Sequence, residues 1–232
     1  ISLGTEFRYL EPQYAGVIDT LYMPNDKLRD RDRWGYYWKH TAKLDAPVGN
    51  AALNWNLRRV SDDNYWRDFS RLPGEGNSLA NADRRLISSD GSLSWSAGKH
   101  SLSLYAQKWQ VLQDIDAPIA PPFNRMPQLQ WRYDTTAWAT QGWDVNLMAE
   151  TTRFEADTWD HRKNPGNGQR SYTLAQVSRP FLLPGGFVTP KVQLHASHYQ
   201  LDNYTSTWAQ NKSLAIPTFS LDSGLVFERD TS

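Results

Sequence analysis

Apolar and polar side chains alternate along most of this chain, in stretches of about ten residues separated by turn-forming sequences. In the first stretch Leu3, Phe7 and Tyr9 occupy one set of alternate positions, and Glu6 and Arg8 occupy the other. Because successive side chains of a β-strand point to opposite sides, this pattern predicts strands with one apolar and one polar face. The fold class is therefore expected to be all-β.

The same alternation predicts about eleven strands along the chain. After the first stretch they cover residues 14–23, 34–44, 51–60, 87–97, 101–111, 127–134, 142–154, 171–181, 187–200 and 216–229. Short connections are expected near 11–13, 45–50, 98–100, 135–141 and 182–186, and long polar ones near 24–33, 62–86, 112–126, 155–170 and 201–215. Alternating short and long connections are typical of an antiparallel, up-and-down transmembrane β-barrel of the outer-membrane kind.

Composition narrows the classes of function without deciding between them. The chain has 25 basic and 25 acidic residues, so no basic excess favours nucleic acid as a partner. Mean hydropathy is −0.68, which a barrel strand tolerates because only alternate residues face lipid. The 11 Trp and 11 Tyr suit rings at two membrane–water interfaces, but they also suit a soluble carbohydrate-binding module.

If the strands form a barrel wall, the alternation assigns side chains to its two faces. The candidate lumen-facing residues are Glu6, Arg8, Asp19, Lys39, Asn54, Asn56, Arg58, Arg132, Asp144, Glu150, Lys191 and Glu228. The candidate lipid-facing residues are Phe7, Tyr9, Trp34, Trp38, Leu53, Trp55, Leu57, Trp131, Trp143, Leu194, Phe219 and Phe227. The polar set is mixed in sign and is expected to be mostly a solvated wall.

No catalytic or metal-binding arrangement is recognisable, so neither an enzyme nor a cofactor is expected. His195 and His198 are three residues apart on a predicted strand, which places them on opposite faces. Asp160-His161 has no recognisable Ser or Cys nucleophile. The glycine-containing stretch 164–168 lacks the Lys and Ser/Thr of a phosphate loop. The chain has no cysteine and therefore no disulfide.

An odd number of strands would not close a bacterial single-chain barrel. A free strand edge in hydrocarbon would also leave backbone groups unpaired, at a cost of several kcal/mol each. We therefore expect residues 1–232 to be a partial barrel domain, with further strands before and after it, and we expect the piece not to fold alone.

Several short sequence motifs along the chain resemble those of one family of outer-membrane barrels. They are Glu6-Phe7-Arg8-Tyr9-Leu10, Leu21-Tyr22-Met23-Pro24-Asn25-Asp26, Arg33-Trp34, Val60-Ser61-Asp62-Asp63 with Tyr65 and Asp68-Phe69, Pro127-Gln128-Leu129, His198-Tyr199-Gln200 and Val226-Phe227-Glu228-Arg229-Asp230. Together they resemble the barrel domain of the LptD family, which assembles lipopolysaccharide in the bacterial outer membrane.

The resemblance implies a barrel of about 26 strands, within the known range. It also implies a plug lipoprotein of the LptE kind inside the barrel, outer-membrane lipid around it, and lipopolysaccharide as the cargo. A periplasmic bridge protein would deliver that cargo through an N-terminal domain that this chain lacks. The chain would then be a mid-wall segment, because the closing strands are also absent, and no gate residue carries over.

Two other functions remain open at this point. A general porin or sugar channel should show a charged constriction, and no cluster of one sign is present. A soluble all-β carbohydrate-binding module would bury the face of Leu53, Trp55 and Leu57 in its core. The substitution Leu57→Arg separates the soluble case from the barrel, because it would block membrane insertion in one and unfold a soluble protein in the other.

Overall fold

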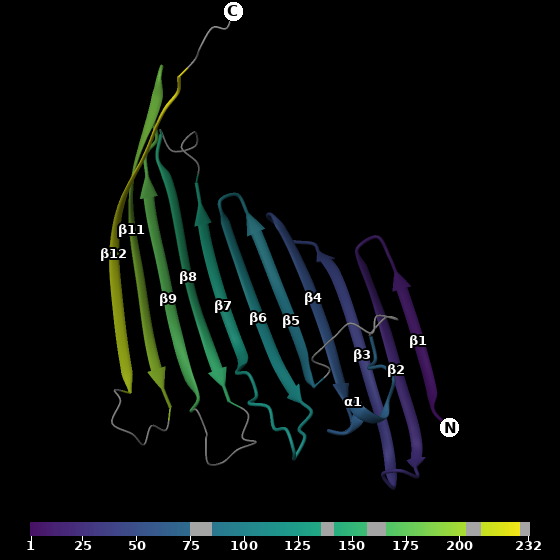
Figure 1. Cartoon of the computed structure of the whole chain (residues 1–232). Helices are drawn as coiled ribbons and strands as arrows, with labels where there is room; N and C mark the ends of the chain where they lie inside the picture. Colours follow the sequence, from purple (N-terminus) through teal and green to yellow (C-terminus); the bar gives the residue numbers. More distant parts are fainter. Residues whose placement is uncertain (75–84, 136–141, 157–165, 203–209, 228–232) are drawn as a thin grey trace, which may run out of the picture.

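The computed structural model describes residues 1–74, 85–135, 142–156, 166–202 and 210–227. Within them, 12 strands form one antiparallel sheet (Figure 1). The strands are β1 (Leu3–Leu10), β2 (Tyr14–Asp26), β3 (Arg31–Leu44), β4 (Asn50–Val60), β5 (Leu86–Ala97), β6 (His100–Val111), β7 (Asn124–Asp134), β8 (Asp144–Glu155), β9 (Gly168–Ser178), β10 (Phe181–Leu183), β11 (Gly186–Leu201) and β12 (Asn211–Leu225). The all-β fold and its sequential, up-and-down order are confirmed.

Eleven of these strands are the predicted ones, and the twelfth, β10, was not predicted. The predicted strand 171–181 ends at Ser178, and the chain then forms a short hairpin in which Leu183 pairs with Gly186. The sheet order is β1 to β9, then β11, with β10 and β12 both paired to β11. Because β10 has only three residues, it lengthens one end of the wall without adding a full strand.

The expected long connection at 24–33 is wrong. Strand β2 continues to Asp26 and β3 begins at Arg31, so only residues 27–30 connect them. The register shifts between Met23 and Asp26, so that Pro24 and Asn25 have no partner on β3. Asn25 has a positive φ of 45°. The Pro-Asn pair predicts a turn, but in the structure it forms a bulge inside the strand.

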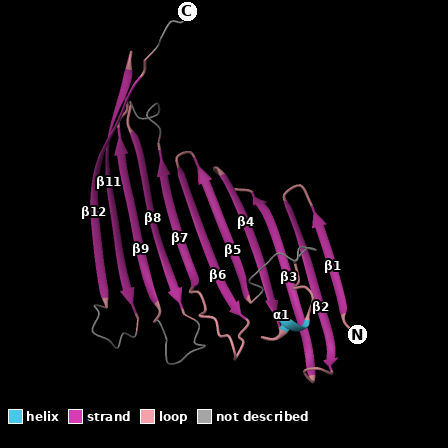
Figure 2. Ribbon diagram, in the orientation of Figure 1, coloured by secondary structure: helices cyan, strands magenta, loops and turns pink. Residues whose placement is uncertain are grey.

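The connections lie at the two ends of the strands and so form two opposite borders of the sheet, which we call edges (Figure 2). One edge, called here the long-connection edge, has the connections 27–30, 61–85, 112–123, 156–167 and 202–210. The opposite, short-connection edge has 11–13, 45–49, 98–99, 135–143 and the β10 hairpin. The connection 135–143 is as long as 202–210, so length separates the two edges less strictly than predicted.

Backbone pairing between β4 and β5 stops part of the way along both strands. Its last pair is Asn56 with Asp90, although β4 continues to Val60. Beyond that point the Ser89 hydroxyl accepts from the Arg58 N–H (2.9 Å) and donates to the Arg58 carbonyl (2.8 Å). The Gln110 amide accepts from the Val60 N–H (3.0 Å) and donates to its carbonyl (2.7 Å). Two side chains therefore replace a backbone ladder at this seam.

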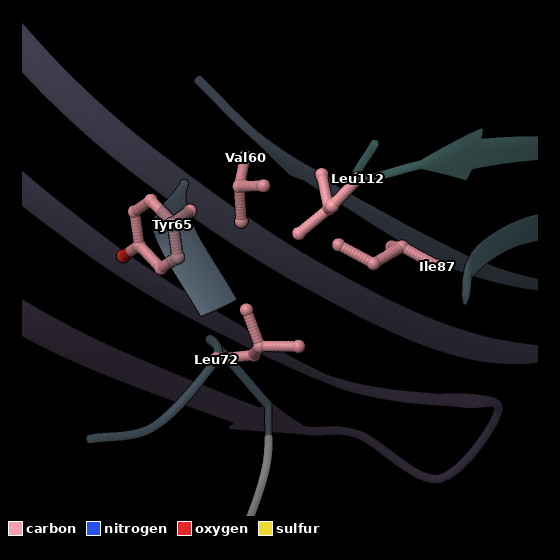
Figure 3. Close-up of a cluster of buried hydrophobic side chains, with 5 residues drawn as sticks. All are labelled: Val60, Tyr65, Leu72, Ile87 and Leu112. Atoms are coloured by element: carbon pink, nitrogen blue, oxygen red, sulfur yellow. The ribbon is translucent and has the colours of Figure 1, made fainter. Parts of the chain in front are cut away.

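A small apolar cluster lies beside the seam. It consists of Val60, Tyr65, Leu72, Ile87 and Leu112, each at most 2% exposed (Figure 3). Tyr65 belongs to the short helix α1 (Tyr65–Asp68) in the connection after β4. A single helical turn is not stable by itself, so these contacts hold it in place. No helix in the described part of the chain has the length and apolar character needed to span a membrane.

Candidate functional site: a connection docked on the polar face

The strand register places the predicted side chains on two opposite faces. Leu53 pairs with Leu93, Leu93 with Leu104, and Leu104 with Leu129, so these four share one face. This face, called the apolar face, also has Phe7, Tyr9, Trp34, Trp38, Trp55, Leu57, Trp131, Leu194 and Phe219. The other, polar face has Glu6, Arg8, Asp19, Lys39, Asn54, Asn56, Arg58, Arg132, Asp144, Glu150 and Lys191.

Three of the predicted residues lie outside this pairing. Trp143 immediately precedes β8, and Phe227 follows β12. Glu228 lies outside the described residues. For the rest, each predicted set occupies one face, while the assignment of the faces to lumen and lipid stays a proposal.

Aromatic rings gather on the apolar face near the short-connection edge. The Tyr9 hydroxyl lies 2.7 Å from His40 Nδ1, and Trp38 Nε1 donates to the Tyr9 hydroxyl (3.1 Å). His40 stacks on Trp55 with ring centroids 4.2 Å apart. Rings that combine apolar area with a polar atom are typical of a membrane–water interface.

On the polar face, the connection after β4 folds back onto the sheet. Residues 61–74, called here the docked segment, reach Asp19 in the middle of β2. Its carboxylate accepts from the Gly74 N–H (2.9 Å) and lies 3.4 Å from Arg71 Nη2. Asp19 is therefore only 3% exposed. The expectation of a solvated wall is wrong at this residue, because the docked segment covers it.

Two glycines allow the backbones to approach closely. A Cβ at Gly35 of β3 would lie 2.8 Å from Pro73 Cγ, and a Cβ at Gly74 would lie 2.3 Å from Tyr37 Cγ. Gly74 also has a φ of +76°, which few side chains adopt without strain. The sequence 73–74 is therefore specifically fitted to β3.

Arg33 of β3 anchors the other end of the docked segment. Its side chain is fully buried, and its Nε and Nη2 donate to both Asp62 oxygens (2.9 and 3.0 Å). Its Nη1 donates to Asp26 (3.0 Å) and to Asp68 (2.8 Å). The guanidinium also lies 4.6 Å from the centroid of the Phe69 ring. One buried cation therefore joins two strands to the segment.

Two outer arginines complete the neutralisation of this site. Arg29 contacts Asp68 at 2.9 and 3.2 Å, and Arg31 lies 3.4 Å from Asp62. With Arg33, three arginines face the carboxylates of Asp26, Asp62 and Asp68. We call these six residues the Arg33 cluster. A buried ion pair is tolerated when its remaining hydrogen-bonding groups are satisfied, as they are here for the guanidinium.

Reasoning from the sequence did not find this cluster as a site. Arg33, Asp62 and Asp68 appear there only as parts of family motifs. The available signal was the density of charge in 26–33, which has three arginines and three aspartates, followed by 62–68 with three aspartates. Such runs are usually solvated, and pairing between them depends on a fold-back that alternation does not predict.

The pKa values of the aspartates in the docked segment follow their partners. Burial raises the pKa of Asp62, but hydrogen bonds from Ser61 and Arg33 outweigh it, and the result is below the ordinary 3.8. The hydrogen bond from Arg29 lowers the pKa of Asp68 against burial, with help from Arg33. Burial raises the pKa of Asp63 by more than a hydrogen bond from the Gln113 backbone lowers it. Burial also raises the pKa of Tyr65 to about 12.

These directions predict that docking survives mild acid and fails in strong acid. A lowered folded pKa means that Asp62 and Asp68 contribute their full stabilisation above pH 3.8 and lose it as pH falls below that value. Asp63 has the opposite sign, because protonation favours its folded state. We expect hydrogen exchange of residues 61–74 in the parent protein, corrected for intrinsic rates, to be unchanged from pH 7 to pH 5. It should rise below about pH 4, and a rise already at pH 5 would contradict the assignment.

The fit at Gly74 gives a second prediction. Gly74 and Gly98 both have positive φ, but a Cβ at Gly98 would meet nothing within 4 Å. Asparagine tolerates this backbone conformation, so Gly74→Asn isolates the collision with Tyr37. We expect Gly74→Asn to cost about 1–3 kcal/mol, as overpacking does, and Gly98→Asn less than about 1 kcal/mol. Protease cleavage of the docked segment measures the difference, and equal cleavage of both variants would show that the contact is unimportant.

A second polar network lies farther along the same face. Glu150 of β8, with a side chain 8% exposed, accepts from Arg170 (2.7 Å), Gln128 (2.8 Å), Gln130 (3.1 Å) and Thr152 (3.1 Å). The Arg170 guanidinium lies 5.5 Å from the Phe154 ring centroid. This predicted lumen residue is therefore also paired rather than solvated.

Neither network is a candidate metal site. In the residues that the structure describes, no group of three or more His, Cys, Asp or Glu could hold a metal ion. His195 contacts Ser197 (3.1 Å) and His198 contacts Ser213 (2.8 Å), and the two histidines lie on opposite faces as predicted. Asp160-His161 and residues 164–165 lie outside the described residues.

Comparison with known proteins gives one consistent result. Residues 31–232 match the family model LptD, described as LPS transport system D. The chain is 53% identical over 231 residues to an LPS-assembly protein LptD of Acidovorax sp. (strain JS42), covering 99% of this chain and 28% of that protein. LPS-assembly proteins LptD of Bordetella pertussis (36% over 243 residues) and Ralstonia nicotianae (36% over 232 residues) match over 99% and 100% of this chain.

The chain spans about 28% of the length of the curated relatives it matches. The match to the Acidovorax protein covers 99% of this chain, and the match to the family model begins at Arg31, at the start of β3. The match covers far more than half of the chain, and its family is one of transport rather than catalysis. This chain belongs to the LptD family.

Proposed function

We propose that this chain is a wall segment of an outer-membrane β-barrel that inserts lipopolysaccharide into the outer leaflet. The observation that carries the proposal is the sheet itself. Its 11 long strands present a continuous apolar face, with aromatic rings near the short-connection edge, opposite a face of mixed charge. Two faces of this kind suit lipid on one side and an aqueous lumen on the other.

In this arrangement the polar face lines the lumen and the long-connection edge faces the outside of the cell. The docked segment then lies inside the barrel against β2 and β3, where it narrows the lumen. The paired Glu150 network and the exposed Lys39 present polar groups to whatever occupies the lumen. A plug lipoprotein and the sugars of lipopolysaccharide are occupants that such a surface suits, because wet interfaces tolerate charge.

Family membership favours this function over the two alternatives. A general porin is not supported, since the described part of the polar face has both cations and anions, some of them paired, rather than a ring of one sign. A soluble carbohydrate-binding module is not supported either, because no second sheet covers the apolar face in the described residues. Delivery of lipopolysaccharide by a periplasmic bridge protein would involve parts of the parent protein outside this chain.

Adjacent positions on one strand can test the assignment of the faces. A photo-crosslinking amino acid is placed at Trp38 or at Lys39 of the full-length parent protein in intact Gram-negative cells. Position 39 should crosslink to a small lipoprotein or to lipopolysaccharide, and position 38 should not crosslink to the lipoprotein. Fractionation of the same cells should recover the protein in the outer membrane. Recovery in a soluble fraction, or equal lipoprotein crosslinking from both positions, would overturn the proposal.

A further inference from the structure

Charged residues on the apolar face lie only at the ends of the strands nearest the long-connection edge, which we call the charged level. Among the described strand residues of that face, the Asp, Glu, Lys and Arg side chains are Asp32, Arg59, Lys108, Arg153 and Glu155. All five lie toward the long-connection edge. On β6, Lys108 is eight residues from the ring-stacked His100, about 26 Å along the strand. This length is of the order of the roughly 25 Å apolar band of membrane barrels.

Two of these five charges, those of Arg153 and Asp32, already have partners. Arg153 forms an ion pair with Asp202 and is attracted to Glu155. Asp32 accepts hydrogen bonds from the Tyr22 hydroxyl (2.7 Å) and from the Asn25 N–H (2.8 Å). Arg59 and Lys108 are exposed, and neither forms an ion pair with any residue that the structure describes. Two cations, Arg59 and Lys108, and one carboxylate, Glu155, are therefore left at this level.

Arg59 and Lys108 line one hollow of about 600 Å³ beside the β4–β5 seam. Tyr36, Leu57 and Met126 contribute apolar surface to it, and Gln110 also belongs to its lining. Glu155 also lines the hollow, beside Asn124. Arg58 lines the hollow as well, although its guanidinium lies over the Tyr37 ring, 5.0 Å from the centroid. The hollow therefore has more cations than anions in its lining, with apolar side chains next to them.

We propose that this hollow binds the phosphate of a phosphorylated lipid headgroup in the outer leaflet, held by Arg59 and Lys108. The inference rests on the proposed function, because it needs the apolar face to lie in the membrane. Cations bind phosphate oxygens through charge-assisted hydrogen bonds, and Arg can do so with two parallel donors. Leu57 and Tyr36 lie where the acyl chains of such a lipid would begin, which free phosphate would not use.

The test measures lipid retention by the full-length parent protein in its native complex. The complex is purified in a non-ionic detergent and analysed by native mass spectrometry with a bis-phosphorylated disaccharide lipid or its dephosphorylated counterpart. The variant is Arg59→Gln with Lys108→Gln. The matched control is Lys27→Gln with Lys99→Gln, which removes the same charge from two exposed turn residues away from the hollow.

We expect the unmodified protein to bind the phosphorylated lipid about tenfold more tightly than the dephosphorylated one. The Arg59/Lys108 variant should lose about that factor, and the control should stay within about twofold. Equal retention by the variant and the unmodified protein would overturn the proposal. Displacement of the lipid by millimolar inorganic phosphate would also overturn it, by showing a simple anion site.

Fractionation of the same cells separates this failure from failure of the proposed function. If the variant and the unmodified protein are both in the outer membrane and retain the lipid equally, only the headgroup site is wrong. If the unmodified protein is not in the outer membrane, both proposals are wrong.

Discussion

Replacing Arg33 by methionine is expected to release the docked segment 61–74 and to cost about 3–5 kcal/mol of stability. Methionine fills a similar volume, but it leaves Asp62, Asp68 and Asp26 without their shared buried donor. An uncompensated buried charge is far more costly than the loss of an exposed ion pair. Thermal unfolding of the full-length parent protein and protease cleavage within 61–74 measure the effect.

Arg31→Met is the matched control for this experiment. Arg31 lies on the same strand and contacts Asp62 at 3.4 Å, but its side chain is 50% exposed. Exposed pairs contribute about 0–1 kcal/mol, so this variant should unfold close to the unmodified protein. Arg33→Lys should fall between the two, because lysine keeps the charge and loses the paired donors. If Arg33→Met and Arg31→Met behaved alike, the cluster would not be what holds the segment.

Leu104→Arg is expected to block insertion of the parent protein, at a cost of about 2–4 kcal/mol. Leu104 lies in the row of four leucines that crosses the apolar face, midway between His100 and Lys108 on β6. An arginine there would be held in hydrocarbon far from either interface. The amount of protein recovered in the outer membrane, and its unfolding in urea after reconstitution, measure the loss.

Two other substitutions by arginine test whether the effect depends on the depth of the residue in the membrane and on the face of the sheet. Ser103→Arg places the charge on the polar face of the same strand and should be tolerated. Alternation alone predicts that Leu57→Arg blocks insertion, but the structure corrects this expectation. Leu57 is one alternate position from Arg59, so the new side chain can extend to the charged level and should cost only about 0–1 kcal/mol. Equal effects at Leu104, Leu57 and Ser103 would show that the apolar face does not lie in a membrane.

Alternation predicted the strands well because each strand has one apolar face and one polar face along its length. Leu53, Trp55 and Leu57 alternate with Asn54 and Asn56 because one face of β4 is apolar along its length. The pattern fails where a residue breaks it for a local reason. Pro24 and Asn25 indicate a turn, yet the strand continues past them through a bulge.

The docked segment could not be predicted in the same way. Its position depends on contacts between residues far apart in sequence, such as Gly74 with Asp19 and Arg33 with Asp62. Alternation predicts that Asp19 is an ordinary residue of the polar face. It indicates which face a side chain occupies, but not which other segment covers that face. The family motifs included Arg33, Asp62 and Asp68, but they gave no indication of the pairing.

The seam between β4 and β5 has a mechanical consequence for the wall. Most neighbouring long strands in the described sheet are joined over nearly their whole length by backbone ladders, which resist bending. The ladder between β6 and β7 is also shortened, because it ends at Gln107 and Arg125 although β6 continues to Val111. At the seam, beyond Asn56, the Ser89 and Gln110 side chains make the connection, and side-chain torsions change more easily than a ladder breaks. A change in curvature between β1–β4 and the strands after them would therefore require only side-chain torsions beyond Asn56, rather than the breaking of a backbone ladder.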